Sequence, residues 1–206
     1  MSDAILQRID AAGVRVEPVQ GVHRWSIRTR PSDRGFLESL FDLPLPVQAL
    51  QSSRSDHGTA LWLGPDEWLV LLGSEGARRF AQRSAQFDWS TAPPSSVVEV
   101  THRSLGLELS GPRATWVLNG GCPLDLSDER FPPGTCTRTL LGKVDIVLHR
   151  AHDAVPCFYL ECWRSFMPYV WNRLKTAISE CVAERVDHQP GAPQPSPRTQ
   201  GPSAPA

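Results

Sequence analysis

Two apolar runs separated by a short turn constrain the fold of this 206-residue chain most strongly. The runs cover residues 59–63 and 68–72, and the segment between them reads Gly64-Pro65-Asp66-Glu67. Proline suits a β-turn because its ring fixes φ, and acidic residues are common turn formers. We therefore predict an antiparallel hairpin over residues 59–72.

The segments around this hairpin alternate between strand and helix patterns. Residues 22–29 and 95–101 have strand character, the latter being rich in valine, while residues 32–41 and 75–87 carry apolar residues at helical spacing. Ser32 and Asp33 are candidates for the cap of the first helix. The predicted order β-α-β-β-α-β is the split-βαβ, ferredoxin-like pattern.

A second cycle of strands and helices follows. It comprises a strand at 105–109, a short helix from Pro112 to Leu118, strands at about 135–141, 144–149 and 157–162, and a last helix at about 165–186. The predicted class is α+β: two ferredoxin-like, split-βαβ cycles that form one compact domain on one antiparallel or mixed sheet system, with a long C-terminal helix.

The two ends of the chain differ from its middle. Residues 1–21 are weakly patterned and predict an N-terminal arm, or an edge strand around Val14 to Val16; the domain itself is expected over residues 22–186. Residues 187–206 are rich in Pro, Gln, Gly, Ser and Ala. Such a segment buries too little apolar area to offset its ordering entropy, so we predict a disordered tail.

Charge and composition exclude several partner classes. The formal net charge is −1, which gives no electrostatic attraction to nucleic acid or to an anionic membrane. No apolar run reaches the length of a membrane span, and the N-terminus lacks a signal-peptide pattern. We expect a cytoplasmic protein without a nucleic-acid or membrane partner. Its five cysteines, an odd number without a C-x-x-C pair, predict reduced, partly buried thiols.

Few residues suggest a chemical site. His149 and His152 have a spacing that could serve a metal, but no third ligand follows, so solvated loop histidines are expected and no metal site is predicted. The tryptophans ordinarily belong to the core, and two of them exposed together would form an interface. The residues that we expect at such a subunit interface are Trp68, Trp163, Arg164, Phe166 and Trp171.

Five motifs in order carry a family resemblance. They are residues 63–69 (LGPDEWL), 110–114 (SGPRA), 121–126 (GCPLDL), 131–134 (FPPG) with Thr139-Leu140-Leu141, and Arg164-Ser165-Phe166 with Tyr169 and Trp171. Together they resemble the gamma subunit of heterotetrameric sarcosine oxidase. That family is in turn similar to the folate-binding fold of the glycine-cleavage T-protein.

The resemblance implies a folate-binding-type domain that acts as a non-catalytic accessory subunit. Its partners would be the alpha and beta, and possibly delta, subunits, which are expected to hold FAD, FMN, NAD and tetrahydrofolate, with no cofactor in this chain. Such a complex demethylates sarcosine to glycine and yields hydrogen peroxide and methylenetetrahydrofolate. A related complex that acts on another N-methyl amine is an open alternative.

One position of the chain carries a catalytic alternative. The resemblance implies that the run Glu99-Val100-Thr101-His102-Arg103 corresponds to the T-protein strand that bears the catalytic aspartate, with Glu99 at the place of that aspartate. The alternative is therefore a stand-alone, folate-binding aminomethyltransferase-like or repair protein that uses Glu99. Glutamate is longer than aspartate by one methylene, and catalytic groups tolerate a misplacement of only about 0.5 Å.

Overall fold

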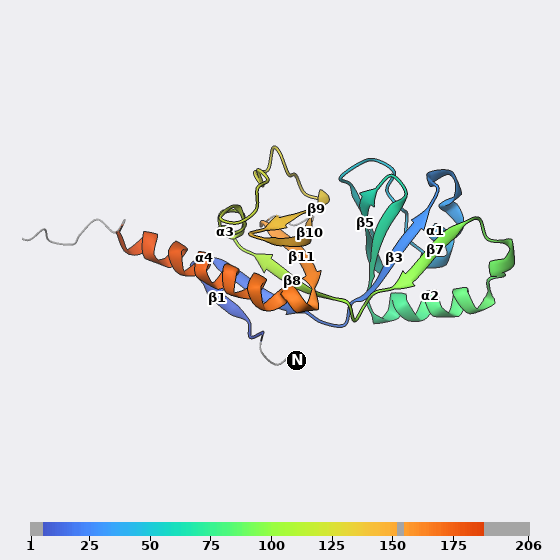
Figure 1. Ribbon diagram of the computed structural model, residues 1–206, viewed down its shortest axis with the longest axis horizontal. Coiled ribbons are helices and arrows are strands. Elements are labelled where there is room, and N and C mark those ends of the chain that lie inside the picture. Colours follow the sequence, from blue (N-terminus) through green and yellow to red (C-terminus); the bar gives the residue numbers. More distant parts are fainter. Residues whose placement is uncertain (1–5, 152–154, 188–206) are drawn as a thin grey trace, which may run out of the picture.

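The chain folds into two antiparallel sheets that face each other, each covered on its outer face by helices (Figure 1). The computed structural model describes residues 6–151 and 155–187. The five-stranded sheet has the order β4-β5-β6-β3-β7, and the six-stranded sheet has the order β1-β2-β8-β11-β10-β9. The sequence predicted one sheet system; the structure has two, because a separate apolar core lies on the outer face of each sheet.

The predicted hairpin is present as β5 (Gly58–Gly64) and β6 (Glu67–Leu72). The two strands pair in antiparallel register, with Leu61 opposite Leu69. Every residue of β6 is buried, because one of its faces packs on helices and the other on the six-stranded sheet. A strand covered on both faces reads as a continuous apolar run, which is the pattern that made this hairpin readable.

The rest of the five-stranded sheet confirms the first split-βαβ cycle. It contains β3 (His23–Thr29) and β7 (Ser95–Glu99), and its helices are α1 (Gly35–Phe41) and α2 (Ser74–Gln86). Ser32 and Asp33, the expected cap, lie instead in a 3-10 turn, η2 (Pro31–Asp33), and Arg34 precedes α1 without a side-chain cap. A second 3-10 turn, η3 (Trp89–Thr91), leads toward β7.

One edge strand of this sheet was not predicted. It is β4 (Ser52–Ser55), whose residues are all polar and therefore show no alternation of apolar side chains. It pairs with β5, with Ser53 opposite Ala60.

The six-stranded sheet has a different strand order from a split-βαβ unit. Its strands are β1 (Ile9–Ala11), β2 (Val14–Val19), β8 (Ser104–Ser110), β9 (Cys136–Leu141), β10 (Val144–Arg150) and β11 (Cys157–Trp163). Strands β9, β10 and β11 form a meander, and β8 pairs with β11. The helices α3 (Ala114–Asn119) and α4 (Met167–Asp187), the latter preceded by η4 (Arg164–Phe166), pack on its outer face and match the predicted short helix and long C-terminal helix.

The N-terminal segment is part of this sheet. Residues 9–19, assigned from the sequence to an arm or an edge strand, form β1 and β2, and Val14 and Val16 are fully buried. β1 is the edge strand of this sheet, while β2 is an interior strand that pairs with both β1 and β8. The boundary expected at residue 22 therefore excludes two strands that complete the core. The predicted tail at 188–206 lies outside the described residues.

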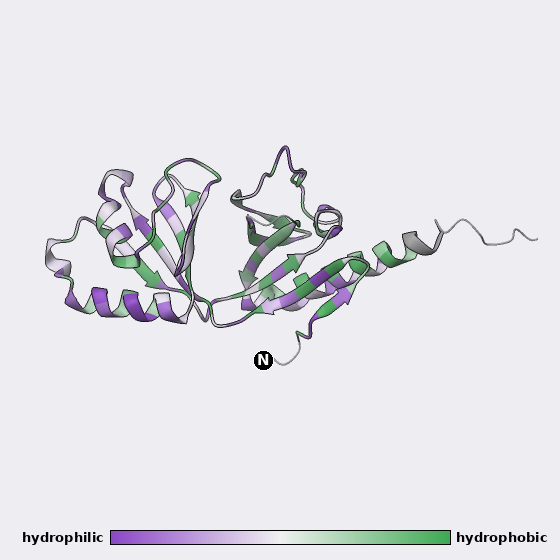
Figure 2. Ribbon diagram, turned by 180° about the vertical axis from the view of Figure 1, so that it is seen from behind, coloured by the Kyte–Doolittle hydropathy of each residue, from purple (hydrophilic) through white to green (hydrophobic). Residues whose placement is uncertain are grey.

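The hydropathy pattern follows the layers. In Figure 2 many strands carry both hydrophobic and hydrophilic residues, whereas α2 shows a mostly hydrophilic outer side. A third hydrophobic cluster lies between the sheets. It includes Leu61, Leu69 and Leu71 of the five-stranded sheet and Cys136 and Val147 of the six-stranded sheet. Within the described ranges, the structure contains no helix that is long and apolar enough to span a membrane.

Candidate functional site

A buried ion pair lies in the layer between the two sheets. The Nε of Arg24 on β3 is 2.8 Å from Oε2 of Glu161 on β11, and both side chains are almost fully buried. The Tyr159 hydroxyl donates to the same carboxylate oxygen at 2.5 Å and accepts from the Arg24 guanidinium at 3.1 and 3.2 Å. Burial and the Glu161 charge raise the pKa of Tyr159 well above its usual range, so the phenol stays protonated and can donate.

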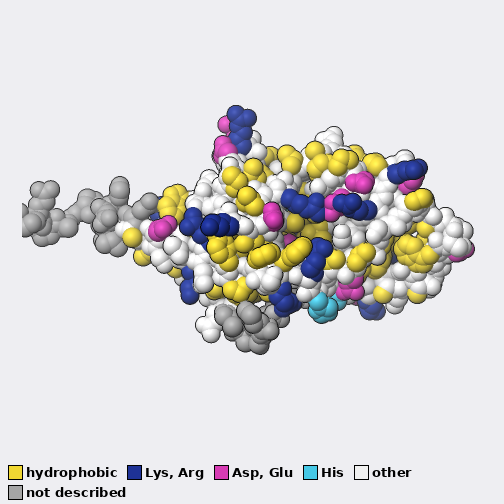
Figure 3. All heavy atoms as spheres, viewed as in Figure 1, with side chains coloured by type: hydrophobic (Ala, Val, Ile, Leu, Met, Phe, Trp, Pro, Cys, Tyr) yellow, Lys and Arg dark blue, Asp and Glu magenta, His cyan; other side chains and the backbone are white. Residues whose placement is uncertain are grey.

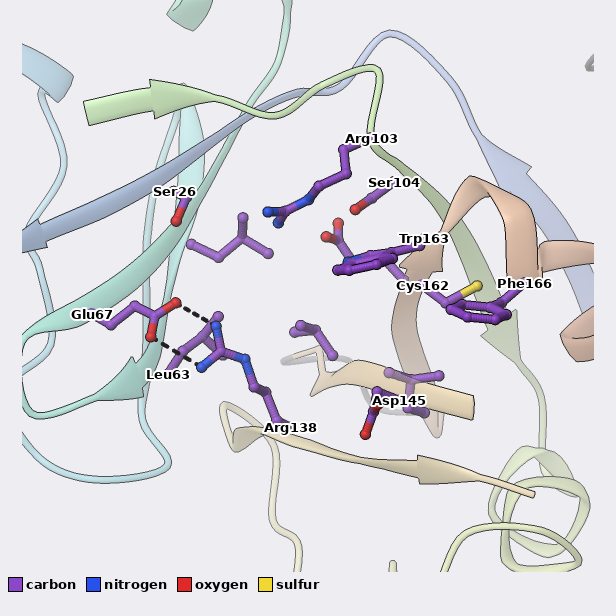
Figure 4. Close-up of a pocket in the computed structure, with 14 residues that line it drawn as sticks. Ser26, Leu63, Glu67, Arg103, Ser104, Arg138, Asp145, Cys162, Trp163 and Phe166 are labelled. Atoms are coloured by element: carbon purple, nitrogen blue, oxygen red, sulfur yellow. Dashed lines mark hydrogen bonds and ion pairs between the residues drawn. The ribbon is translucent and has the colours of Figure 1, made fainter. Parts of the chain in front are cut away.

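A second polar group links the two sheets. Glu67, at the start of β6, accepts hydrogen bonds from Arg28 on β3 at 2.8 Å and from both terminal nitrogens of Arg138 on β9, one of them at 3.1 Å (Figure 4). Hydrogen bonds from Arg138 and then from Arg28 outweigh the effect of burial and lower the pKa of Glu67. The Glu67 carboxylate is therefore charged and bridges the two sheets.

A pocket of about 350 Å³ opens between these two polar groups. Glu67 and Arg138 line one side, and Arg103, Trp163 and Phe166 line another (Figure 4). Glu161 is also among the residues that line it. The pocket therefore combines charged groups with exposed aromatic rings, which is typical of a binding surface.

Two aromatic side chains form the rim of this pocket. Trp163, the last residue of β11, is 57% exposed, and Phe166 in η4 is 46% exposed. Their rings stack, with centroids 6.2 Å apart and planes 21° from parallel. Arg164 lies between them in sequence, and its side-chain Nε donates to the His102 carbonyl at 3.2 Å.

The structure separates the five residues expected at a subunit interface. Trp163 and Phe166 lie together on the surface, and Arg164 is half-buried. Trp68 and Trp171 are instead core residues, with 0% and 7% exposure. Trp68 packs between its sheet and α1 and donates its indole N–H to the Pro46 carbonyl at 2.7 Å, while Trp171 faces the six-stranded sheet from α4.

Glu99, the catalytic candidate, lies on the other face of the five-stranded sheet. It is the last residue of the edge strand β7, and it lines a separate hollow together with Trp25 and Trp89. Its side chain is 53% exposed, accepts a hydrogen bond from the Thr101 hydroxyl at 2.8 Å and lies 3.7 Å from His23 Nδ1. The structure does not bring Glu99 together with the inter-sheet pocket.

His149 was expected in a solvated loop but is a buried residue of β10. Its Nε2 lies 3.0 Å from the hydroxyl of Ser52 on β4, which also contacts the Gly134 carbonyl at 2.7 Å. The contact joins the two sheets, which explains why the histidine is not exposed. His152 lies outside the described residues.

The cysteines match the prediction of buried thiols. All five are free and buried. Burial raises the pKa of Cys136 and of Cys162 to about 12, with the nearby Glu161 adding to the effect at Cys162. Within residues 6–151 and 155–187, no three His, Cys, Asp or Glu side chains gather in a way that could hold a metal.

Sequence reasoning missed the charged residues between the sheets. Glu161 interrupts the otherwise apolar strand Cys157–Trp163, and a charge in such a strand indicates a buried partner. Arg24 lies in the mixed strand His23–Thr29, where it alternates with Trp25 and Ile27 as a solvent-facing residue would. That signal could have marked Glu161 as buried, but not Arg24. It could not have paired them, because they are 137 positions apart in sequence.

Comparisons with known proteins agree on one family. The model of the sarcosine oxidase gamma subunit family matches residues 32–180. The sarcosine oxidase subunit gamma of Corynebacterium sp. (strain P-1) is 31% identical over 189 residues and covers 90% of each chain. That of Arthrobacter sp. is 29% identical over 156 residues, covering 74% of this chain and 75% of the relative.

Two solved structures share the fold. A chain of the heterotetrameric sarcosine oxidase from Corynebacterium sp. U-96, in complex with pyrrole 2-carboxylate, superposes with a TM-score of 0.72 at 22% identity, covering 84% of this chain and 87% of that chain. Glycine cleavage system aminomethyltransferase T from Bartonella henselae gives a TM-score of 0.57 at 14% identity, covering 80% of this chain and 46% of that one. At these identities the likeness establishes the folate-binding-type fold alone.

Proposed function

The chain belongs to the sarcosine oxidase gamma subunit family, and from this premise we propose that it is a non-catalytic gamma subunit of a heterotetrameric sarcosine oxidase complex. Its partners are the alpha and beta, and possibly delta, subunits. They hold FAD, FMN, NAD and tetrahydrofolate and carry out the oxidative demethylation of sarcosine to glycine. This chain docks on them and stabilises the assembly.

The stacked pair of Trp163 and Phe166 carries this proposal. Both rings lie on the surface, although each would bury a large apolar area if it were covered by another chain. Aromatic residues are enriched at the centres of protein interfaces and depleted from surfaces that face only water. The pair lies within the region matched by the family, which supports an interface shared by its members.

The position of Glu99 supports a non-catalytic role. A general base acts best in a preorganised site that excludes water. Glu99 instead lies half-exposed on an edge strand, bonded to Thr101. The comparisons do not favour a stand-alone aminomethyltransferase-like protein, because the T-protein match is 14% identical and the curated relatives are sarcosine oxidase subunits.

Co-expression tests the proposal. The tagged chain is produced together with the alpha, beta and delta oxidase genes of its own genome, and the complex is isolated by affinity and size-exclusion chromatography. We expect the chain to co-elute with the other subunits in fixed stoichiometry and to raise the thermal midpoint of the assembly, since binding stabilises the bound state. An oxidase that forms with the same yield, stability and sarcosine turnover without the chain contradicts the proposal.

A further inference from the structure

The inner face of the six-stranded sheet extends beyond the five-stranded sheet that covers it. On β11, Glu161 is buried beneath Arg24, but Trp163, two residues further on the same face, is 57% exposed. On β9, Arg138 reaches Glu67 of the other sheet, but Leu140, again two residues further, is 40% exposed. One end of this sheet face is therefore uncovered.

The uncovered end carries a cluster of exposed apolar side chains. The cluster consists of Leu140, Trp163, Phe166 and Tyr169, which are between 40% and 57% exposed. Trp163 stacks on Phe166, which lies one helical turn before Tyr169. The Tyr169 hydroxyl accepts a hydrogen bond from the backbone N–H of Lys143, which lies in the turn after β9, the strand of Leu140. Figure 3 shows hydrophobic and charged side chains next to one another across the middle of the face in view. An exposed apolar patch rimmed by charge marks an interaction surface.

Arg103 adds a cation beside this cluster. Its guanidinium points into the pocket, between Ser26 and Trp163 in Figure 4. Among the described residues it has no hydrogen-bond or ion-pair partner. The two buried carboxylates of the pocket are already engaged, Glu161 by Arg24 and Glu67 by Arg28 and Arg138.

The remaining acidic side chain of the pocket, Asp145, lies across it from Arg103 in Figure 4. The guanidinium of Arg103 is thus open to an external carboxylate, which it can bind through two parallel hydrogen bonds.

The backbone holds Arg103 and the aromatic rim in a fixed relation. Ser104, the next residue, pairs with Trp163 across strands β8 and β11. The Arg164 backbone N–H donates to the Arg103 carbonyl at 2.9 Å, and the Arg103 N–H donates to the Val100 carbonyl at 3.0 Å. A cation and an apolar surface that are positioned before binding lose less entropy when the partner arrives.

We propose that Arg103 binds an aspartate or glutamate side chain of the neighbouring oxidase subunit, whose apolar residues cover Leu140, Trp163, Phe166 and Tyr169. This inference rests on the proposed gamma-subunit function and identifies the docking surface and the chemistry of the partner segment. A protein segment fits better than a small carboxylate, because the apolar cluster extends outward from the pocket onto the surface. The cluster is also continuous with the stacked Trp163–Phe166 pair that carries the proposed function.

Binding measurements on the full-length chain test the inference. The chain is immobilised, and an oxidase assembly prepared without the gamma chain is applied to measure the Kd. The NaCl concentration is varied from about 50 to 500 mM, a range over which salt progressively screens charge pairs. The variants are Arg103→Ala, Trp163→Ala and, as a matched control, Arg54→Glu, which changes an exposed arginine on β4. Thermal unfolding of each free variant checks its fold.

We expect Arg103→Ala to weaken binding by about 30-fold or more at low salt and to reduce the salt dependence of Kd, because it removes a charge pair at the interface. Trp163→Ala should weaken binding but keep the salt dependence, and Arg54→Glu should bind like the wild type. If the Kd of Arg103→Ala stays within about twofold of the wild-type Kd and shows the same salt dependence, this inference is overturned, but the gamma-subunit function is not. Failure of the wild-type chain to bind any oxidase subunit contradicts the function itself.

Discussion

The guanidinium of Arg24 and the carboxylate of Glu161 form a 2.8 Å ion pair that joins the two sheets of the molecule. Arg24 lies on β3 of the five-stranded sheet and Glu161 on β11 of the six-stranded sheet. Among residues 6–151 and 155–187, the chain passes between the sheets only twice, after β2 and after β7. Packing and polar contacts between the sheets therefore fix how they face each other.

Removal of one partner of this pair should destabilise the chain strongly. Arg24→Ala leaves the Glu161 carboxylate buried without its cation, and breaking a buried pair in this way costs about 3–5 kcal/mol. Urea unfolding followed by circular dichroism measures the loss. The double variant Arg24→Met with Glu161→Leu should recover much of it, because no charge then remains buried. A single variant as stable as the wild type contradicts a structural role for the pair.

The second tie between the sheets predicts a pH dependence. Hydrogen bonds from Arg138 and Arg28 hold the pKa of Glu67 below its ordinary value of 4.5. The unfolded state therefore binds the proton more readily than the folded state. The contribution of Glu67 to stability is present above the ordinary pKa and is lost as the pH falls through the lowered, folded-state pKa.

We expect Glu67→Gln to flatten the decline in unfolding free energy below the ordinary pKa. Urea unfolding at a series of pH values from about 3 to 6 measures this slope, which reports the difference in bound protons. Glu129→Gln, which changes an exposed loop carboxylate, is the control and should keep the wild-type slope. Equal slopes for Glu67→Gln and the wild type contradict the prediction.

The periodic segments of the chain could be predicted from sequence, and the contacts between them could not. The hairpin of β5 and β6 could be predicted because both of its strands are apolar and the turn between them is polar. Strand β4 lacks any apolar residue, and β1 is only three residues long, so neither carries a readable pattern. Val14 and Val16 did alternate, but two valines could not distinguish an interior strand from an arm.

The candidate site shows the same division. Trp163 and Trp68 each lie near the end of a strand, so the sequence alone could not tell which one is exposed. The exposure of each ring depends on the element that packs against its strand. Helix α1 covers Trp68, whereas the five-stranded sheet ends before it reaches Trp163. Arg103 was named from the sequence only as the last residue of the run that resembles the T-protein strand. One arginine in a loop has no distinctive pattern, so its place in the pocket becomes visible only in the structure.

Alanine substitutions at these two tryptophans should therefore behave oppositely. Trp68→Ala removes a fully buried ring and its hydrogen bond, which should lower the unfolding free energy of the free chain by about 3–5 kcal/mol. Trp163→Ala alters an exposed ring and should change it by less than about 0.5 kcal/mol. Urea unfolding of both variants makes the comparison. A stable Trp68→Ala chain would return Trp68 to the interface candidates.

The buried cysteines predict slow reaction with thiol reagents. At pH 8 a thiol with a pKa of about 12, as for Cys136 and Cys162, is almost entirely protonated and poorly nucleophilic. All five cysteines are also shielded from solvent. Ellman's reagent should therefore modify the native chain slowly and titrate five thiols in guanidinium chloride. Rapid modification of Cys136 or Cys162 in the native state contradicts this burial.

Substitution of Glu99 separates the accessory role from a folate-dependent enzyme. The carboxylate accepts a hydrogen bond from Thr101 on an exposed edge strand, so Glu99→Ala should leave both the fold and the sarcosine turnover of the complex unchanged. Glu99→Gln, which keeps the side-chain length and removes the charge, is the matched variant. Isothermal titration of the free chain with tetrahydrofolate completes the test: an accessory subunit shows no saturable binding. Saturable tetrahydrofolate binding that weakens in both variants would instead identify Glu99 as a residue of a functional folate site. A Glu99 side chain with only a structural role on this strand would not affect tetrahydrofolate binding.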